Sequence, residues 1–251
     1  MGKAELGNAV YFPLFLRWAY DTLILGFICS YAWGCPRDIL QGHYSKHVGP
    51  LAGRSIPRLL DIGVGTGHFV EHAPLTSGTN VLLADINKNP LSEAQGRIRR
   101  AHKDVTVDTV LANVFELGDE RSSSSQRLAS CVRDEGDDAF DVISCMLLLH
   151  CLPGDGARKG SAVASLSRLL KPDGSLVGAT VLGKGVRHNA MGRVLMFVNN
   201  LTGIFDNYGD GASDIVEPLK AAFKSVDFRV AGTTLLFEAN SPKNPGMSLK
   251  F

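Results

Sequence analysis

The sequence predicts an α/β fold built on a seven-stranded, mainly parallel sheet. Short apolar runs alternate with helical patterns along the middle of the chain, and each run is continuously apolar. This pattern is typical of parallel strands that are covered on both faces. Near the end of the chain, strand patterns at 226–230 and 233–238 are separated only by Ala231 and Gly232. So short a link permits only an antiparallel hairpin.

The chain begins with a region that has a helical pattern to about residue 50. Apolar residues between Phe15 and Phe27 recur at helical spacing. The stretch 10–33 is apolar enough to suggest a membrane span, but Arg17 and Asp21 interrupt it. Charges near the bilayer centre are costly. We therefore expect no membrane span and interpret this region as a helical cover.

The core elements follow from residue 58. In chain order we expect strands at 58–63, 81–85, 105–114, 140–146 and 175–182, and helices at 69–73, 91–102, 161–170 and 215–223. Lys171-Pro172-Asp173-Gly174 predicts a turn before the fifth strand. The serine-containing, acidic stretch 118–138 predicts a surface insertion before the fourth strand.

Composition excludes several classes of protein. The 251 residues include 26 Lys+Arg and 25 Asp+Glu, and 45% are apolar, so the chain is not disordered as its main state. A net charge of +1 argues against a nucleic-acid partner, because phosphate binding needs a basic excess. The five cysteines contain no CxxC pair, which argues against a zinc site or a disulfide framework. We expect no metal and a reducing, cytoplasmic location.

The strongest functional signal is the segment 59–67, Leu-Leu-Asp-Ile-Gly-Val-Gly-Thr-Gly. A glycine-rich turn between a strand and a helix lets the backbone approach a nucleotide closely. A dinucleotide fingerprint would have its third glycine at position 68, but His68 stands there and the third glycine is Gly67. Asp61, two residues before Gly63, would sit poorly beside a pyrophosphate and suits a ligand that presents an amine.

Two further polar positions follow later strands. Asp85 ends the second strand, where a carboxylate can accept hydrogen bonds from both hydroxyls of a ribose. The amide of Asn113, near the end of the third strand, can read an adenine edge with Val114 against the ring. An ordinary capping or turn role is an equal alternative for Asn113. The set indicates a ligand with an adenosine half and an amino-acid half.

The Asp-Ile-Gly-Val-Gly-Thr-Gly motif at 61–67, Asp85 and the C-terminal hairpin resemble the class I methyltransferases that use S-adenosylmethionine. The resemblance covers about residues 20–238 and implies a Rossmann-like sheet, S-adenosylmethionine as cofactor and S-adenosylhomocysteine as product. The family more often has Asp where Asn113 stands. The cofactor-binding residues that the resemblance implies are Tyr20, Asp61, Gly63, Gly65, Gly67, Asp85, Ile86, Asn113, Val114, Cys145 and Met146.

We expect a single methyltransferase domain over 1–251, with a helical lid at 1–50 and a cofactor-binding α/β core at 58–239. The segment 149–154 resembles a subgroup of microbial and fungal proteins that act on small metabolites. Members of the family that methylate nucleic acids or protein amides carry Asn/Asp-Pro-Pro-aromatic after strand four, but this chain has Ser-Cys-Met-Leu at 144–147. The expected substrate is therefore a small, apolar metabolite, methylated at oxygen.

His150 is the candidate catalytic base, because it follows strand four and imidazole titrates near neutral pH. The alternative is a histidine at a helix start, packed beside Leu149 and Leu152. His43 and His47 lie four residues apart on one helical face and could bind a metal, but the sequence shows no third ligand.

Two other functions stay open from the sequence. The first is an NAD(P)-dependent oxidoreductase on a related sheet, against which His68 and the antiparallel tail argue. The second is a protein that keeps the cofactor site without net methyl transfer, as a binding module or as a cyclase or isomerase. Product mass separates this second function from methylation, because only methylation adds a methylene unit.

Overall fold

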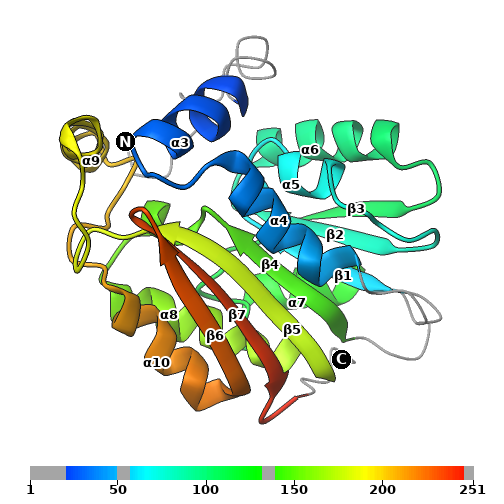
Figure 1. The fold of residues 1–251 in the computed structure, drawn as a ribbon. Helices are drawn as coiled ribbons and strands as arrows, with labels where there is room; N and C mark the ends of the chain where they lie inside the picture. The colour runs from blue at the N-terminus through cyan, green and yellow to red at the C-terminus, as the bar shows by residue number, and fades with distance from the viewer. Residues whose placement is uncertain (1–20, 50–56, 132–138, 246–251) are drawn as a thin grey trace.

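The computed structural model describes residues 21–49, 57–131 and 139–245. The sheet at its centre has the strand order β3-β2-β1-β4-β5-β7-β6 (Figure 1). Its strands are β1 (Arg58–Ile62), β2 (Asn80–Asp85), β3 (Thr106–Leu111), β4 (Phe140–Met146), β5 (Leu170–Val181), β6 (Phe223–Ala231) and β7 (Thr234–Pro242). The first five strands pair in parallel, and β7 pairs antiparallel with both β5 and β6. The predicted sheet and its C-terminal hairpin are confirmed.

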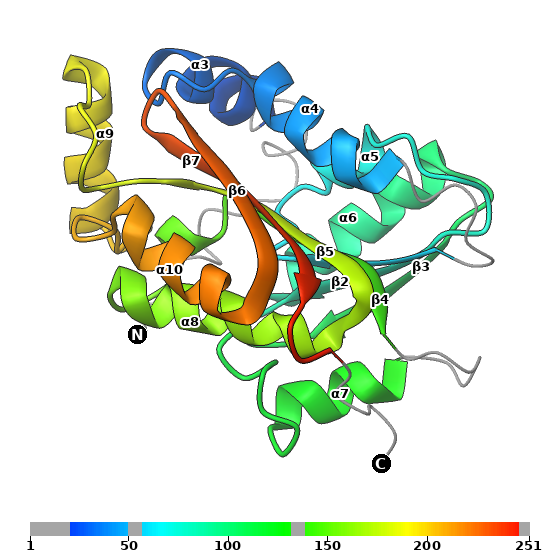
Figure 2. The ribbon, with the colours of Figure 1, turned by 60° about the horizontal axis from the view of Figure 1, so that its bottom comes forward.

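Helices cover both faces of the sheet. They are η1 (Asp21–Ile28, a π-helix), α3 (Cys29–Tyr31), α4 (Arg37–Val48), α5 (His68–Glu71), α6 (Lys88–Ala101), α7 (Ser123–Cys131), η3 (Leu149–Cys151), α8 (Gly156–Ser165), η4 (Leu166–Leu169), α9 (Ala190–Leu201) and α10 (Ala212–Ala222). Helices α4, α5 and α6 lie on one face, and α7, α8 and α10 lie on the other (Figures 1 and 2).

Two apolar clusters fill the space between the sheet and these layers. Leu59 packs with Leu40 of α4 and Ile98 of α6. Leu60 packs in the other cluster with Val163 of α8. Neighbouring residues of β1 therefore serve opposite cores, because successive side chains of a strand point to opposite faces. Burial on both faces explains why the strands have continuous apolar runs.

Two local predictions were wrong. The segment 171–174 does not form a turn before the fifth strand but lies within β5 as an irregularity: Phe140 pairs with Leu170, and Val142 pairs with Ser175. Turn-forming residues here produce a bulge, because β5 continues in the same direction. The serine-rich segment contains helix α7, which buries Ser124 and Leu128 against the core.

The N-terminal cover forms a hydrogen bond with the tip of the β6–β7 hairpin. The backbone carbonyl of Trp33 accepts a hydrogen bond from the Thr233 amide at 2.7 Å. A Cβ on Gly232, whose φ is +58°, would lie 2.1 Å from the same carbonyl oxygen. Only glycine permits this approach. Among the described residues, no helix is long and apolar enough to cross a bilayer.

Candidate functional site

The candidate site is a cavity of about 500 Å³ at the carboxyl ends of β1, β2 and β4. Its floor is the glycine loop at 63–66, and its walls come from η1, α3 and the segment after α9. Open α/β sheets bind ligands at this edge, where neighbouring crossovers leave in opposite directions. β1 lies between β2 and β4 in the sheet, so the loop that follows it stands at this switch point.

The glycine loop has two separate roles. Gly65 has φ +51°, and a Cβ built on it would meet no atom within 4 Å, so its backbone borders open space in the cavity. Gly67 has φ +76°, and its Cβ would lie 2.8 Å from the Cβ of Ala94 in α6. Gly67 does not border the cavity. Gly65 thus leaves room for a ligand against its backbone. Gly67 lets the loop pack closely against α6.

Asp61 is a buried carboxylate in the cavity wall. It is the register partner of Ser144 across β1 and β4, and the Ser144 hydroxyl donates a short hydrogen bond to its Oδ1. Burial raises the pKa of Asp61 to about 6, with a further rise from the Asp85 charge and an opposing effect of Ser144. No Lys or Arg contacts Asp61 within the described residues. The site therefore suits a cationic group on a ligand.

Asp85 stands at the end of β2 on the other side of the loop. Its Oδ1 accepts a hydrogen bond from the Asn87 amide at 2.8 Å. Burial raises its pKa to about 6, although the amides of Asn87, Ile86 and Val64 lower it. Backbone amides thus hold the side chain, and the described chain supplies no cation to it. Such a carboxylate can accept hydrogen bonds from ligand hydroxyls.

The predicted adenine-binding residues line the same cavity. Val114 is buried, Ile86 is exposed at 56%, and both contribute to the wall with Asn113. The side chain of Asn113 also forms a local turn, because its Oδ1 accepts from the Phe115 amide at 3.1 Å. The capping role that the sequence left open is therefore present, and contact with an adenine stays a prediction for Asn113.

Of the predicted cofactor-binding residues that the structure describes, Cys145 and Gly67 do not border the cavity. Cys145 is fully buried and belongs to the apolar cluster on the α8 side, whereas Met146, the next residue of β4, lines the cavity. The alternation of side chains along the strand accounts for the difference. Tyr20 lies outside the described residues.

His150 lines the other half of the cavity and is 5% exposed. Its Nδ1 accepts a hydrogen bond from the Val181 amide at 3.3 Å and lies 3.3 Å from the Thr180 hydroxyl. Its ring stands edge-on to Phe205, with centroids 4.4 Å apart. Burial, with the Lys159 charge, lowers its pKa to about 3. The imidazole is therefore neutral at physiological pH.

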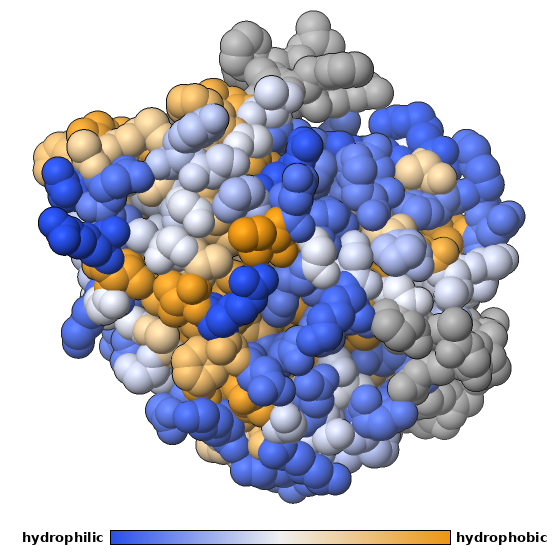
Figure 3. Space-filling view, viewed as in Figure 1, coloured by the Kyte–Doolittle hydropathy of each residue, from blue (hydrophilic) through white to orange (hydrophobic). Residues whose placement is uncertain are grey.

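The half of the cavity around His150 is mainly apolar, although Asn199 and Asp206 also line it. Leu152, Leu195, Ile204 and Phe205 contribute to its wall. Apolar side chains also gather on the surface where α3 and α9 lie (Figure 3). The exposed large apolar residues of η1, α3 and α9 are Leu23, Phe27, Tyr31, Val194, Phe197, Val198 and Leu201. The apolar part of the cavity wall therefore suits an apolar ligand.

Sequence reasoning missed a polar cluster behind the glycine loop. Asp21 of η1 accepts hydrogen bonds from the Thr66 hydroxyl at 2.7 Å and from Arg97 Nη1 at 2.5 Å. Arg97 also pairs with Glu71. Burial acts to raise the pKa of Asp21, but hydrogen bonds from His68, Thr66 and Arg97 outweigh it and lower the pKa to about 2. This cluster joins the cover to the cofactor loop.

No sequence pattern predicts this cluster, because its members lie far apart in the chain. In the sequence Asp21 interrupts an apolar segment, and Arg97 lies on a polar helix. Asp206 is a second missed residue of the cavity wall, and its Oδ2 accepts from the Gly154 amide at 3.0 Å.

The arrangement fits S-adenosylmethionine, the ligand that the sequence motif implies. Asp61 and Asp85 each offer a carboxylate without a Lys or Arg partner among the described residues, and such groups can accept hydrogen bonds from an amine or from hydroxyls. Gly65 presents open backbone between them, and Val114 supplies an apolar surface. A pyrophosphate would meet two buried anions here, which argues against a dinucleotide.

Comparisons with known proteins agree with this geometry. A family model described as a methyltransferase domain matches residues 60–176. "Methyltransferase verB" of Penicillium polonicum is 35% identical over 237 residues, which cover 90% of this chain and 94% of verB. The "Physcion biosynthesis cluster O-methyltransferase" of Aspergillus chevalieri is 32% identical, covering 95% of this chain and 96% of that protein.

Solved structures share the fold. The N-methyltransferase NodS of Bradyrhizobium japonicum, solved with S-adenosylhomocysteine, superposes with a TM-score of 0.54 and 15% identity. The match covers 82% of this chain and 88% of NodS. The family matches favour methyl transfer over the oxidoreductase and isomerase alternatives.

Proposed function

Because the chain belongs to the class I S-adenosylmethionine-dependent methyltransferases, we propose that it methylates a hydroxyl oxygen of a small, apolar metabolite. One observation carries the substrate class: the cavity continues from two uncompensated carboxylates into an apolar half around His150. The relatives named O-methyltransferases support oxygen as the acceptor.

S-adenosylmethionine supplies a methyl group that is already activated for in-line displacement by a nucleophile. We assign its amine to Asp61, its ribose hydroxyls to Asp85 and its adenine to the wall formed by Ile86 and Val114. The protein's contribution is then to align the acceptor and to exclude water. The cover supplies that exclusion through apolar residues such as Leu25 and Ile28, which line the cavity.

His150 orients the acceptor oxygen in this proposal. Since its Nδ1 accepts the Val181 amide proton, the neutral ring carries its own proton on Nε2. In that tautomer His150 donates a hydrogen bond, and its lowered pKa makes it a weak proton acceptor. The role of general base that the sequence suggested is therefore replaced by that of a donor to an oxyanion. The preferred acceptors are hydroxyls acidic enough to ionise in water, such as phenols and enols.

A methylation assay tests the function. The enzyme is incubated with S-adenosylmethionine carrying a deuterated methyl group and a panel of apolar phenols, enols and matched amines. We expect S-adenosylhomocysteine and a labelled O-methyl ether from an acidic hydroxyl. Labelled amine products alone would contradict the proposed acceptor, and products of unchanged mass would favour an isomerase.

A matched pair of variants tests His150. Replacing an oxyanion donor costs about 100-fold in kcat in well-studied enzymes. We expect His150→Phe to lose activity on that scale while its Kd for S-adenosylhomocysteine changes less than threefold. His150→Gln, which can donate through its amide, should retain more activity. Equal loss of cofactor binding in both variants would show that His150 is structural.

A further inference from the structure

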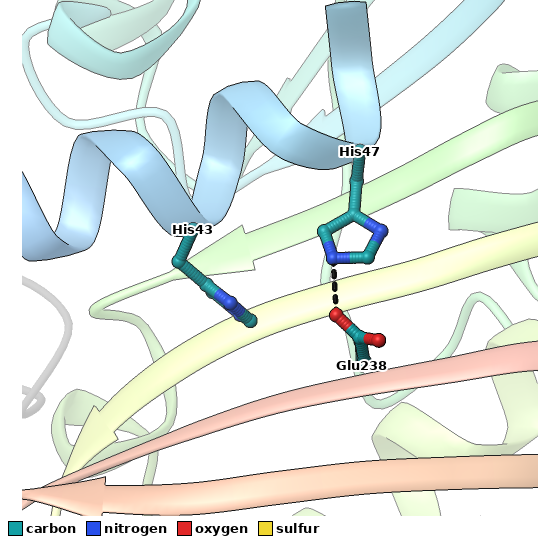
Figure 4. Close-up of side chains that lie close together, drawn as sticks. All are labelled: His43, His47 and Glu238. Carbon is teal, nitrogen blue, oxygen red and sulfur yellow. Dashed lines mark ion pairs between the residues drawn. The ribbon is translucent and has the colours of Figure 1, made fainter. Parts of the chain in front are cut away.

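A groove outside the cofactor cavity contains a cluster of metal-ligating side chains. It has a volume of about 640 Å³ and lies between α4 and the β6–β7 hairpin. His43 and His47 stand one turn apart on α4, and Glu238 of β7 faces them (Figure 4). Candidate ligand atoms of the three side chains lie within 4.8 Å of one another. The sequence offered the two histidines, and the fold supplies the third ligand from a distant strand.

We propose that His43, His47 and Glu238 form a zinc site that clamps helix α4 to strand β7. Two histidines and one carboxylate are a common zinc ligand set, with a fourth position for water. Ligand atoms of a tetrahedral site with Zn–N of about 2.0–2.1 Å lie about 3.3 Å apart. All candidate ligand atoms lie within 4.8 Å of one another, so no pair has to close by more than about 1.5 Å to reach that spacing.

The surroundings of His47 favour binding of a cation. Nε2 of His47 lies against Oε2 of Glu238, is shielded from solvent and makes no hydrogen bond of regular geometry. Nε2 of His43 donates a hydrogen bond to the Phe237 carbonyl oxygen at 3.1 Å, next to Glu238 in the strand, and an ion bound through this nitrogen would replace that bond. All three side chains border or adjoin the open groove, which gives an ion a route from solvent.

Lys46 supplies the competing arrangement. Its Nζ lies 3.1 Å from Glu238 Oε2, so an ammonium group now neutralises the carboxylate. The Lys46 side chain is 67% exposed, and it can swing into solvent when a divalent cation takes its place. The zinc site and the ion pair therefore make opposite predictions for removal of Lys46.

The role of the clamp follows from its position. Helix α4 follows the turn that contains Trp33, and Trp33 lines the cofactor cavity. Glu238 pairs in register with Val177 of β5. A bound ion would join α4 to β7, the strand next to the edge strand β6, without entering the cavity, so we assign it a structural role.

Calorimetric titration of the untagged, chelator-treated protein with Zn²⁺ tests the site. We expect one saturable site per chain and a rise in Tm on binding. His47→Gln and Glu238→Gln should each weaken binding at least tenfold, and Co²⁺ should give the absorption of a tetrahedral complex only in the wild type. His72→Gln is the matched control, because His72, the C-cap residue of α5, belongs to a second His/Glu group and should not change the titration.

Lys46→Met decides between the two arrangements. For a zinc site, removing the competing ammonium should tighten Zn²⁺ binding several-fold. For an ion-pair cluster alone, the variant should lower Tm and leave Zn²⁺ binding undetected. Absence of saturable binding to the folded wild type, or an equal loss in His72→Gln and His47→Gln, would overturn the proposal. Circular dichroism of each variant establishes that it is folded.

Discussion

Carboxylates at the amino ends of the parallel strands (the amino edge) have a cationic partner, whereas those at the carboxyl ends (the carboxyl edge) have none among the described residues. At the amino edge, Asp141 of β4 accepts a hydrogen bond from the Arg58 amide at 2.7 Å and pairs with Lys171 at 3.2 Å. At the carboxyl edge, Asp61 and Asp85 contact no Lys or Arg of the described chain, and burial raises the pKa of each to about 6. A charge compensated by the protein stabilises the fold, whereas an uncompensated one is available to a ligand.

The largest expected effect of a substitution is on stability at the amino edge. Asp141→Asn removes the carboxylate charge that contacts Lys171, and breaking a buried ion pair costs about 3–5 kcal/mol. We expect a clear loss in the free energy of unfolding by urea titration. The Kd for S-adenosylhomocysteine should stay within about twofold of the wild type. A large loss of affinity in the folded variant would break the proposed division between the edges.

Asp61→Asn should have the opposite signature at the carboxyl edge. A pKa raised from 3.8 to about 6 means that the fold disfavours the ionised form of Asp61 by about 3 kcal/mol. This value is the upper limit of the stability that the neutral amide can add. We expect the ligand-free variant to have a Tm at or above that of the wild type. Cofactor affinity should fall about 10- to 100-fold, because hydrogen bonds to charged groups contribute about 1.5–3 kcal/mol. A lower Tm with intact affinity would make Asp61 structural.

Asp85→Ala sharpens the same comparison. We expect it to weaken S-adenosylhomocysteine binding about tenfold while Tm changes little, because the described chain gives Asp85 no cationic partner. Calorimetry and thermal unfolding on the same samples measure both quantities. Parallel loss of affinity and stability would assign Asp85 to the fold.

The cluster behind the glycine loop lies between these extremes. Asp21 has cationic and hydroxyl partners, yet it joins the cover to Thr66 of the loop. Asp21→Asn should raise the Kd for S-adenosylhomocysteine about fivefold, mostly through faster dissociation, since about 1 kcal/mol is typical of one weakened hydrogen bond. Stopped-flow dissociation kinetics measure this change. Thr66→Val, which removes one bond only, should have a smaller effect in the same direction.

The smallest effect is the dependence of cofactor binding on pH. Ionised Asp61 and Asp85 favour the bound ligand, so affinity should be flat above pH 7 and fall as pH drops through about 6. The sign follows because protonation removes the charge that attracts the amine. His150 stays neutral over this range and should add no titration step. Affinity that rises between pH 7 and pH 5 would contradict these assignments.

The sequence predicted the fold well where apolar pattern decides structure. Continuous apolar strands and a two-residue link were enough for the sheet and hairpin, because burial on both faces leaves a readable signature. The turn predicted at 171–174 was wrong, because these turn-forming residues produce a bulge within β5. Turn-forming residues indicate either a turn or a bulge. Only the pairing of β5 with β4 distinguishes the two.

The cofactor half of the site was also readable, since its residues follow strand ends in chain order. Asp61, Gly65 and Asp85 come together at one sheet edge because parallel strands share that edge. The prediction for Cys145 was wrong, because the sequence does not show which residues of β4 point toward the cavity. Asp21 with Arg97, and His43 with Glu238, were hidden because the pairs join elements 76 and about 195 residues apart.

Calorimetric titration with S-adenosylhomocysteine at pH 7.5 tests the central claim most directly. Wild type, Asp61→Asn and Asp141→Asn are compared on folded protein. We predict one saturable site in the wild type, nearly unchanged affinity in Asp141→Asn and a loss of at least tenfold in Asp61→Asn. Absence of binding by the folded wild type, or equal affinity in all three proteins, would contradict the assignment of the carboxyl edge as the cofactor site.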